Sequence, residues 1–199
     1  MQVDGPRMLA ALNRLKELWK EQGAPIADVL APGLSQEAFE PESTGLPFEI
    51  PTELQILWSW HNGLDRRVPR HNARFSVGPG WFTFLSLEDA TEAYWEQCDI
   101  HSQEFSDSVG GLQPVWGSDW LIFLERDGDR VIVSANQVAQ GEVCPVRRVS
   151  KEWFGFDVDR TDSVTELVER WSAAFENGCY RWSGDDWVVD VATPGAIPL

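Results

Sequence analysis

The stretch that most constrains the fold is residues 45–64, which contains a short apolar helix with a marked beginning and a marked end. Pro51 suits the first helical position, because the amide that proline lacks would have no partner within the helix there. The apolar residues form two stripes at helical spacing, one of Leu54, Leu57 and Trp58 and one of Ile56 and Trp60. A helix that is apolar on two faces must be covered on both. We therefore expect residues 51–61 at the centre of the domain.

Polar residues near the two ends of this helix fit its dipole. Glu53 places a negative charge in the first turn, where the dipole favours it. His61 near the other end is interpreted as a cation that the dipole stabilises, with a ligand or pH-switch role as the alternative. Asn62-Gly63 predicts the end of the helix, because glycine adopts the left-handed conformation without a Cβ clash.

Length and composition predict one acidic domain. The chain of 199 residues is long enough for one hydrophobic core, and no linker-like segment divides residues 1–199. The net charge of -16 and the 11 tryptophans are both unusual. An acidic surface repels nucleic acid and anionic membranes, which argues against both as partners. The charge serves either solubility or docking of a basic partner, and the tryptophans serve either the core or exposed binding anchors.

The cysteines and the N-terminal segment predict a cytoplasmic protein. Cys98, Cys144 and Cys179 are odd in number and far apart, which fits a reduced compartment better than a disulfide framework. Residues 1–19 contain no continuous apolar segment of the kind found in signal peptides. No run approaches the roughly 20 apolar residues that a membrane span needs.

Hydrophobic periodicity predicts an α+β fold, with a mostly antiparallel sheet over residues 81–149 and helices packed on one side. Helices are expected in an N-terminal extension at 6–32, at 51–61, at 86–102 and at 161–178. Strands are expected at 81–85, 113–116, 120–125, 130–135 and 143–149. Asp127-Gly128 favours a type I′ hairpin turn between two of these strands. Residues 179–199 form a C-terminal tail.

Three short motifs in this order resemble those of one known family. The first is Leu46-Pro47 followed by the apolar helix and Asn62-Gly63. The second begins at Pro114 and continues through Asp119 to Phe123, and the third is Asp162-Ser163 at the start of the closing helix. Together they resemble the SUKH superfamily over about residues 46–178. One departure is that Asp119-Trp120 stands where the family often has Gly-Asp.

The resemblance implies a binding function. The SUKH superfamily includes bacterial immunity proteins that neutralise toxins and fungal regulators of cell-wall assembly. We therefore expect a non-catalytic immunity-type protein that binds a toxin domain. The alternative is a regulatory scaffold that binds proteins of its own cell, and an enzyme with an unrecognised site is the third possibility.

Motifs of enzymes and metal sites are absent from the sequence. It contains no G-x-S-x-G, no G-x-x-x-x-G-K-[ST], no H-E-x-x-H and no calcium-binding loop. Cys98 and His101 have helical i, i+3 spacing, but zinc needs three or four ligands and the remaining cysteines and histidines show no matching spacing. We expect no catalytic residue, no cofactor and no metal.

Residues 66–74 concentrate the basic side chains of this acidic chain, namely Arg66, Arg67, Arg70, His71 and Arg74. Such a cluster can bind a phosphate or an acidic partner. The alternative, which we favour, is that these arginines pair with the protein's own carboxylates.

Residues 88–129 are the most acidic part of the chain, with eleven acids and only one lysine or arginine, Arg126. This segment is either a solvated face or a docking surface for a basic toxin domain. The predicted partner-binding carboxylates are Asp119, Asp127 and Asp129, with Trp116 and Trp120 as apolar anchors if they are exposed. The strand at 120–125 is apolar on both faces, so burial of Trp120 in the core is the alternative. Residues 66–74 and 182–187 are the other candidate surfaces.

Overall fold

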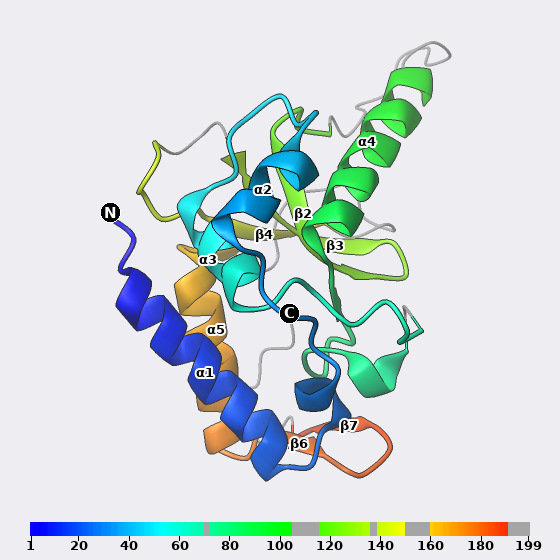
Figure 1. Cartoon of the computed structure of the whole chain (residues 1–199). Helices are drawn as coiled ribbons and strands as arrows, with labels where there is room; N and C mark the ends of the chain where they lie inside the picture. The colour runs from blue at the N-terminus through cyan, green and yellow to red at the C-terminus, as the bar shows by residue number, and fades with distance from the viewer. Residues whose placement is uncertain (70–71, 105–115, 136–138, 150–159, 191–199) are drawn as a thin grey trace.

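The computed structural model describes residues 1–69, 72–104, 116–135, 139–149 and 160–190, and Figure 1 shows their arrangement. In chain order the elements are α1 (Gly5–Glu21), η1 (Pro25–Asp28), α2 (Gln36–Ser43), α3 (Thr52–Trp60), η2 (Ala73–Phe75), β1 (Thr83–Phe84), α4 (Leu87–Glu104), β2 (Trp120–Arg126), β3 (Asp129–Ser134), β4 (Val146–Val149), β5 (Arg160–Thr161), α5 (Val164–Glu176), β6 (Tyr180–Trp182) and β7 (Trp187–Val189). Residues 113–115 of one expected strand lie outside the described residues, as does much of the expected tail.

An antiparallel sheet in the order β1-β2-β3-β4-β5 confirms the α+β fold that the sequence predicts. The hairpin between β2 and β3 turns at Asp127 and Gly128, whose φ angles of 44° and 91° are those of a type I′ turn. The pairing register shifts between Ile122 and Leu124, which marks a bulge in β2. Residues 120–124 are all buried, so both faces of this strand are covered.

Helices α1, α3 and α5 contact one another, whereas α4 packs along β2 and against α2 (Figure 1). Asp4 caps α1 by accepting a hydrogen bond from the amide of Arg7 at 3.1 Å. Ser163 caps α5 in the same way, accepting from the amide of Glu166 at 2.9 Å, and the spacing of this serine and glutamate in the sequence is that of a capping box. A bidentate ion pair between Arg7 and Glu169 joins α1 to α5.

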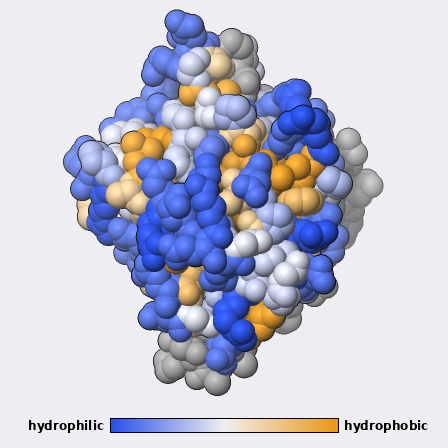
Figure 2. All heavy atoms as spheres, turned by 60° about the horizontal axis from the view of Figure 1, so that its bottom comes forward, coloured by the Kyte–Doolittle hydropathy of each residue, from blue (hydrophilic) through white to orange (hydrophobic). Residues whose placement is uncertain are grey.

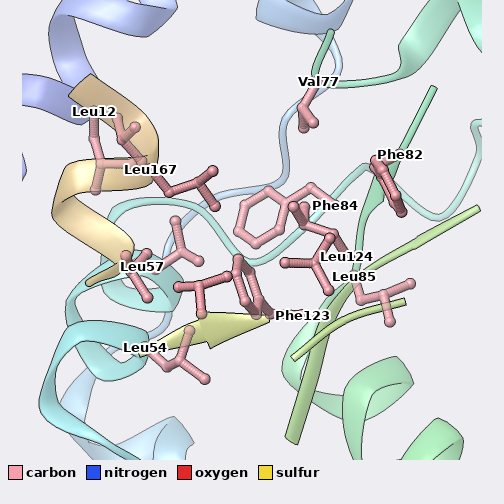
Figure 3. Packing of buried hydrophobic residues seen from close by; sticks show 14 of the residues in the cluster. Leu12, Leu54, Leu57, Val77, Phe82, Phe84, Leu85, Phe123, Leu124 and Leu167 are labelled. Atoms are coloured by element: carbon pink, nitrogen blue, oxygen red, sulfur yellow. The ribbon is translucent and has the colours of Figure 1, made fainter. Parts of the chain in front are cut away.

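Helix α3 lies in the core, as its two apolar stripes predict. Trp58 is 0% exposed, and its indole N–H donates to the carbonyl oxygen of Leu85 at 3.0 Å. Leu54 and Leu57 point into the cluster of buried side chains in Figure 3, which also includes Phe84, Phe123, Leu124 and Leu167. This cluster brings α3, α5 and the first strands of the sheet together around one hydrophobic core.

Glu53 has a different role from the one its position in α3 suggests. Its side chain is 0% exposed and reaches the first turn of α5. Its carboxylate accepts hydrogen bonds from the amides of Val164 and Thr165, the hydroxyl of Thr165, and the amide and thiol of Cys144. Negative charge at a helix N-terminus is stabilised by the unpaired amides there. Glu53 therefore joins α3, α5 and the segment before β4.

Asn62-Gly63 connects α3 to α4 rather than ending α3 by a left-handed cap. Helix α3 ends at Trp60, and the next residue, His61, is already extended. The side-chain oxygen of Asn62 accepts from the amide of Leu87, in the first turn of α4, at 2.8 Å. Gly63 has a φ of 72°, and a Cβ there would lie 2.4 Å from the amide nitrogen of Ser86. The motif thus fixes where α4 begins.

His61 is neutral, which corrects its interpretation as a cation on the helix dipole. Its Nδ1 lies 2.6 Å from the carbonyl oxygen of Ala31 and its Nε2 lies 2.9 Å from the ammonium of Lys16. Because an ammonium group only donates, Nε2 must accept and Nδ1–H must donate to Ala31. Burial, followed by the nearby Lys16 charge, lowers the pKa of His61.

The last described segment is a small hairpin of β6 and β7. Trp182 and Trp187 face each other across it at 5.1 Å between ring centroids, and Trp187 is buried. Among the residues that the structure describes, no helix is long and apolar enough to span a membrane.

Candidate protein-binding surface on helix α4

The outer face of α4 combines an exposed tryptophan with a stripe of carboxylates. The helix carries six acidic residues and no lysine or arginine. Five exposed positions follow one another at steps of four, three, one and three residues, which places them on one face. They are Glu88, Glu92, Trp95, Glu96 and Asp99. The opposite face, with Leu87, Ala90 and Tyr94, is buried as the sequence predicts. We call the exposed stripe the α4 face.

Trp95 is 44% exposed and held by a rigid neighbour. Its ring meets the ring of Tyr94 edge-on at 5.0 Å between centroids. Tyr94 is itself fixed by an edge contact with Phe48 at 5.3 Å and by a hydrogen bond from its hydroxyl to the carbonyl oxygen of Ser118 at 2.8 Å. Burial raises the pKa of Tyr94 to about 12, so the hydroxyl keeps its proton. An aromatic ring in a fixed position loses little entropy when a partner covers it.

A polar cleft of about 220 Å³ adjoins the α4 face. It lies between residues 64–68 and the first turns of α4, with Thr83 and Phe84 of β1 among its lining residues. Glu88 and Glu92 belong to both the cleft and the α4 face. We call this hollow the α4 cleft. The position of Asn62-Gly63 against the first turn of α4 brings its two walls together.

Two arginines of the basic cluster pair with carboxylates of this cleft, as the sequence analysis favours. Arg66 forms an ion pair with Glu88. Arg67 donates from Nε to Asp65 Oδ1 at 2.9 Å and holds the pKa of the Asp65 carboxyl far below its usual range. Arg70 and His71 lie outside the described residues.

The predicted anchors Trp116 and Trp120 are not exposed, which corrects that part of the prediction. Their exposed fractions are 8% and 9%, and their rings pack edge-on at 5.2 Å. Trp120 belongs to β2, which is apolar on both faces and is covered on both, and Trp116 packs against Trp120. Core burial, the alternative for Trp120, is what the structure has.

The predicted carboxylates Asp119, Asp127 and Asp129 do not form one patch. Asp119 precedes β2, and its carbonyl oxygen accepts from the amide of Ala135 at 2.8 Å. Asp127 is exposed in the turn at the other end of this seven-residue strand, which is about 23 Å away at the usual rise per residue. Asp129 pairs with Arg148 at 2.8 Å, and both side chains are largely buried. Asp119 therefore lies at the opposite end of β2 from Asp127 and Asp129, so these three aspartates do not form one cluster.

A second exposed tryptophan, Trp81, has partners of its own. It is 40% exposed and has a φ of 58°, a strained conformation for a bulky residue. The guanidinium of Arg126 lies over its ring at 4.6 Å, and its indole N–H donates to Asp186 at 3.1 Å. Because these contacts already occupy the ring and its donor, Trp81 is a weaker candidate anchor than Trp95.

Sequence reasoning singled out the acidic segment but did not single out Trp95. The signal was present, because Leu87, Ala90, Tyr94 and Cys98 define the buried stripe of this helix and leave Trp95 outside it. The surface in Figure 2, which brings the lower part of Figure 1 forward, is mostly hydrophilic, with hydrophobic residues in separate spots. That face shows no broad apolar patch to compete with the α4 face.

Within the part of the chain that the structure describes, no group of three or more His, Cys, Asp or Glu side chains is placed to hold a metal ion. A comparison with models of known protein families gives no match. A comparison with curated proteins gives no match either.

Proposed function

We propose that this chain is a cytoplasmic, non-catalytic immunity protein that neutralises a basic toxin domain by binding it through the α4 face. The observation that carries the proposal is the exposed Trp95 within a stripe of four carboxylates. Tryptophan is enriched among the residues that dominate binding energy, and surrounding polar groups exclude water from such an anchor. The motifs that resemble the SUKH superfamily support the immunity role.

The charge of the α4 face indicates the chemistry of the partner. A toxin that acts on nucleic acid is basic, because it must hold phosphates. An inhibitor can offer carboxylates where those phosphates would lie, and the net charge of -16 then speeds the encounter by long-range attraction. Glu88, Glu92, Glu96 and Asp99 supply these carboxylates on one helix. The same surface repels nucleic acid itself, so the expected partner is a protein.

The first test is titration calorimetry of the full chain with the toxin domain encoded beside its gene. Trp95→Ala is expected to weaken binding about 30-fold or more, which corresponds to the loss of about 2 kcal/mol that marks a dominant interface residue. Trp81→Ala is the matched control, because that ring is exposed to a similar degree but does not lie on α4. Its affinity should stay within about threefold of the parent.

Protection of cells is the second test. The parent chain should protect cells that express the toxin, and Trp95→Ala should protect them less than Trp81→Ala does. A parent chain that neither binds nor protects would refute the proposal. So would an enzymatic turnover that survives repurification and disappears with one polar substitution.

A further inference from the structure

We propose that the α4 cleft receives one arginine side chain of the partner, which displaces the chain's own Arg66 from Glu88. This inference rests on the proposed function, because it names what the toxin inserts beside Trp95. The cleft has a volume of about 220 Å³, and its lining includes Arg66, Thr83, Glu88 and Glu92.

The hydroxyl of Thr83 points to a ligand in the cleft. Thr83 is only 4% exposed and lines the cleft on its β1 side. Among the described residues, none forms a hydrogen bond with this side-chain hydroxyl. Its oxygen is not among the fully enclosed side-chain atoms that lack a partner, so it is open to the cleft and can take a hydrogen-bond partner there. A donor that enters the cleft would supply one to Thr83 and would meet the carboxylates of Glu88 and Glu92 at the same time.

The ion pair between Arg66 and Glu88 shows which cation the cleft accepts. Arg66 lines the cleft, yet its side chain is 75% exposed and that of Glu88 is 51% exposed. Ion pairs this exposed are weak because water screens them and both side chains lose freedom. Arg66 therefore acts as a tethered competitor that a partner's arginine can replace. Once displaced, its guanidinium is free to contact the partner or solvent.

The arrangement of acceptors favours arginine over lysine. A guanidinium is planar and has five N–H donors, so it can bind a carboxylate through two hydrogen bonds and still donate to a third group. The acceptors here include the carboxylates of Glu88 and Glu92, one helical turn apart, and a hydroxyl on the facing strand. The carboxylates of Asp65 and Asp89 also line the cleft. An ammonium group is a compact, strongly hydrated charge and gains less from such a fork.

The test is an NMR titration of the full chain with N-acetyl-arginine amide. Arg66→Ala should bind this probe about threefold more tightly than the parent, because a tethered competitor has been removed. Arg74→Ala is the matched control, because it removes the same charge from η2, outside the cleft. Thr83→Val should weaken binding about threefold without lowering the thermal midpoint, since the lost hydroxyl has no partner among the described residues. N-acetyl-lysine amide should bind about threefold more weakly than the arginine probe.

Equal effects of Arg66→Ala and Arg74→Ala would overturn the inference, as would equal binding of the lysine and arginine probes. Unchanged binding by a folded Thr83→Val variant would do the same. Because Arg66 is exposed, its variant gives an answer even if Thr83→Val does not fold. These titrations need no toxin, so their failure leaves the proposed function standing if the toxin still binds through Trp95. Success here with no toxin binding would reject the proposed function alone.

Discussion

The carboxylate of Glu53 in α3 accepts two hydrogen bonds from Thr165 in α5, from its amide at 2.9 Å and its hydroxyl at 2.7 Å, although 112 positions separate these residues. The same carboxylate accepts from the amide of Cys144 at 2.9 Å. One buried side chain therefore holds the first turn of α5 and the segment before β4 against the central helix. Charge-assisted hydrogen bonds of this kind are the strong ones.

Glu53→Gln is expected to lower the free energy of unfolding by about 2–4 kcal/mol, because the NH2 group that replaces one carboxylate oxygen cannot accept from the buried amides that this oxygen accepts from. Urea unfolding of the parent and the variant measures this loss of stability. Glu49→Gln is the matched control, since Glu49 is exposed in the segment before α3, and it should cost less than about 0.5 kcal/mol. Equal stability of the two variants would show that the buried carboxylate contributes nothing.

Trp58→Ala should cost about 3–5 kcal/mol, because it leaves a cavity in the core and an unpaired carbonyl at Leu85. The loss is large for a domain of ordinary stability. Trp95→Ala removes the same side chain from the surface and should cost less than about 1 kcal/mol. Thermal or urea unfolding of the two variants measures this difference. A Trp58→Ala variant as stable as the parent would contradict the prediction.

Gly63→Ala should be more damaging than Gly178→Ala, although the two glycines have φ angles of 72° and 73°. At both sites alanine pays the left-handed penalty of about 1–2 kcal/mol. At Gly63 a Cβ would also lie 2.4 Å from the amide nitrogen of Ser86, whereas at Gly178 nothing lies within 4 Å. We expect an additional loss of at least about 1 kcal/mol at Gly63 in urea unfolding. Equal losses would contradict the close approach of this glycine to the backbone of Ser86, just before α4.

The lowered pKa of His61 predicts that the protein becomes less stable in mild acid. Its folded-state pKa lies below the ordinary value of 6.5, so the unfolded chain takes up the proton first as the pH falls. The contribution of His61 to the free energy of unfolding is complete above about pH 6.5. It is lost as the pH falls from there through the lower folded-state pKa. His61→Asn, which cannot take up this proton, should show a smaller loss between about pH 8 and 5 in urea unfolding. An identical pH dependence would show that His61 is not the responsible group.

Local signals in the sequence predicted those parts of the fold that depend on neighbouring residues. The Asp127-Gly128 turn and the capped start of α5 at Ser163 are examples, because each is determined within a few positions. The central position of α3 was also predictable, since its two apolar stripes required cover on both sides.

Relationships between distant segments were not predictable from the sequence. Glu53 looked like an ordinary first-turn acid, because nothing local indicates that its partners are Val164 and Thr165. Asn62-Gly63 looked like a helix stop because glycine is common there. Its close approach to Ser86 forms only in the folded chain and leaves no local signal. At the candidate site, the acidic segment could be recognised in the sequence. Which of its tryptophans is exposed depends on the burial of each side chain, and the sequence does not give that. Trp116 and Trp120 are in the core, whereas Trp95 is on the surface.

The central claim, that the α4 face receives a basic toxin, is tested most directly by the association rate with the toxin as a function of ionic strength. Exposed charges at an interface act mainly on the encounter rate. The variant Glu92→Lys/Glu96→Lys reverses two charges of the α4 face, and Asp127→Lys/Asp185→Lys makes the same change in total charge at two exposed sites outside it. We predict that the first variant associates at least about tenfold more slowly at low salt and loses most of its salt dependence, while the second stays close to the parent. Equal effects of the two variants, or a larger effect of the second, would contradict the claim.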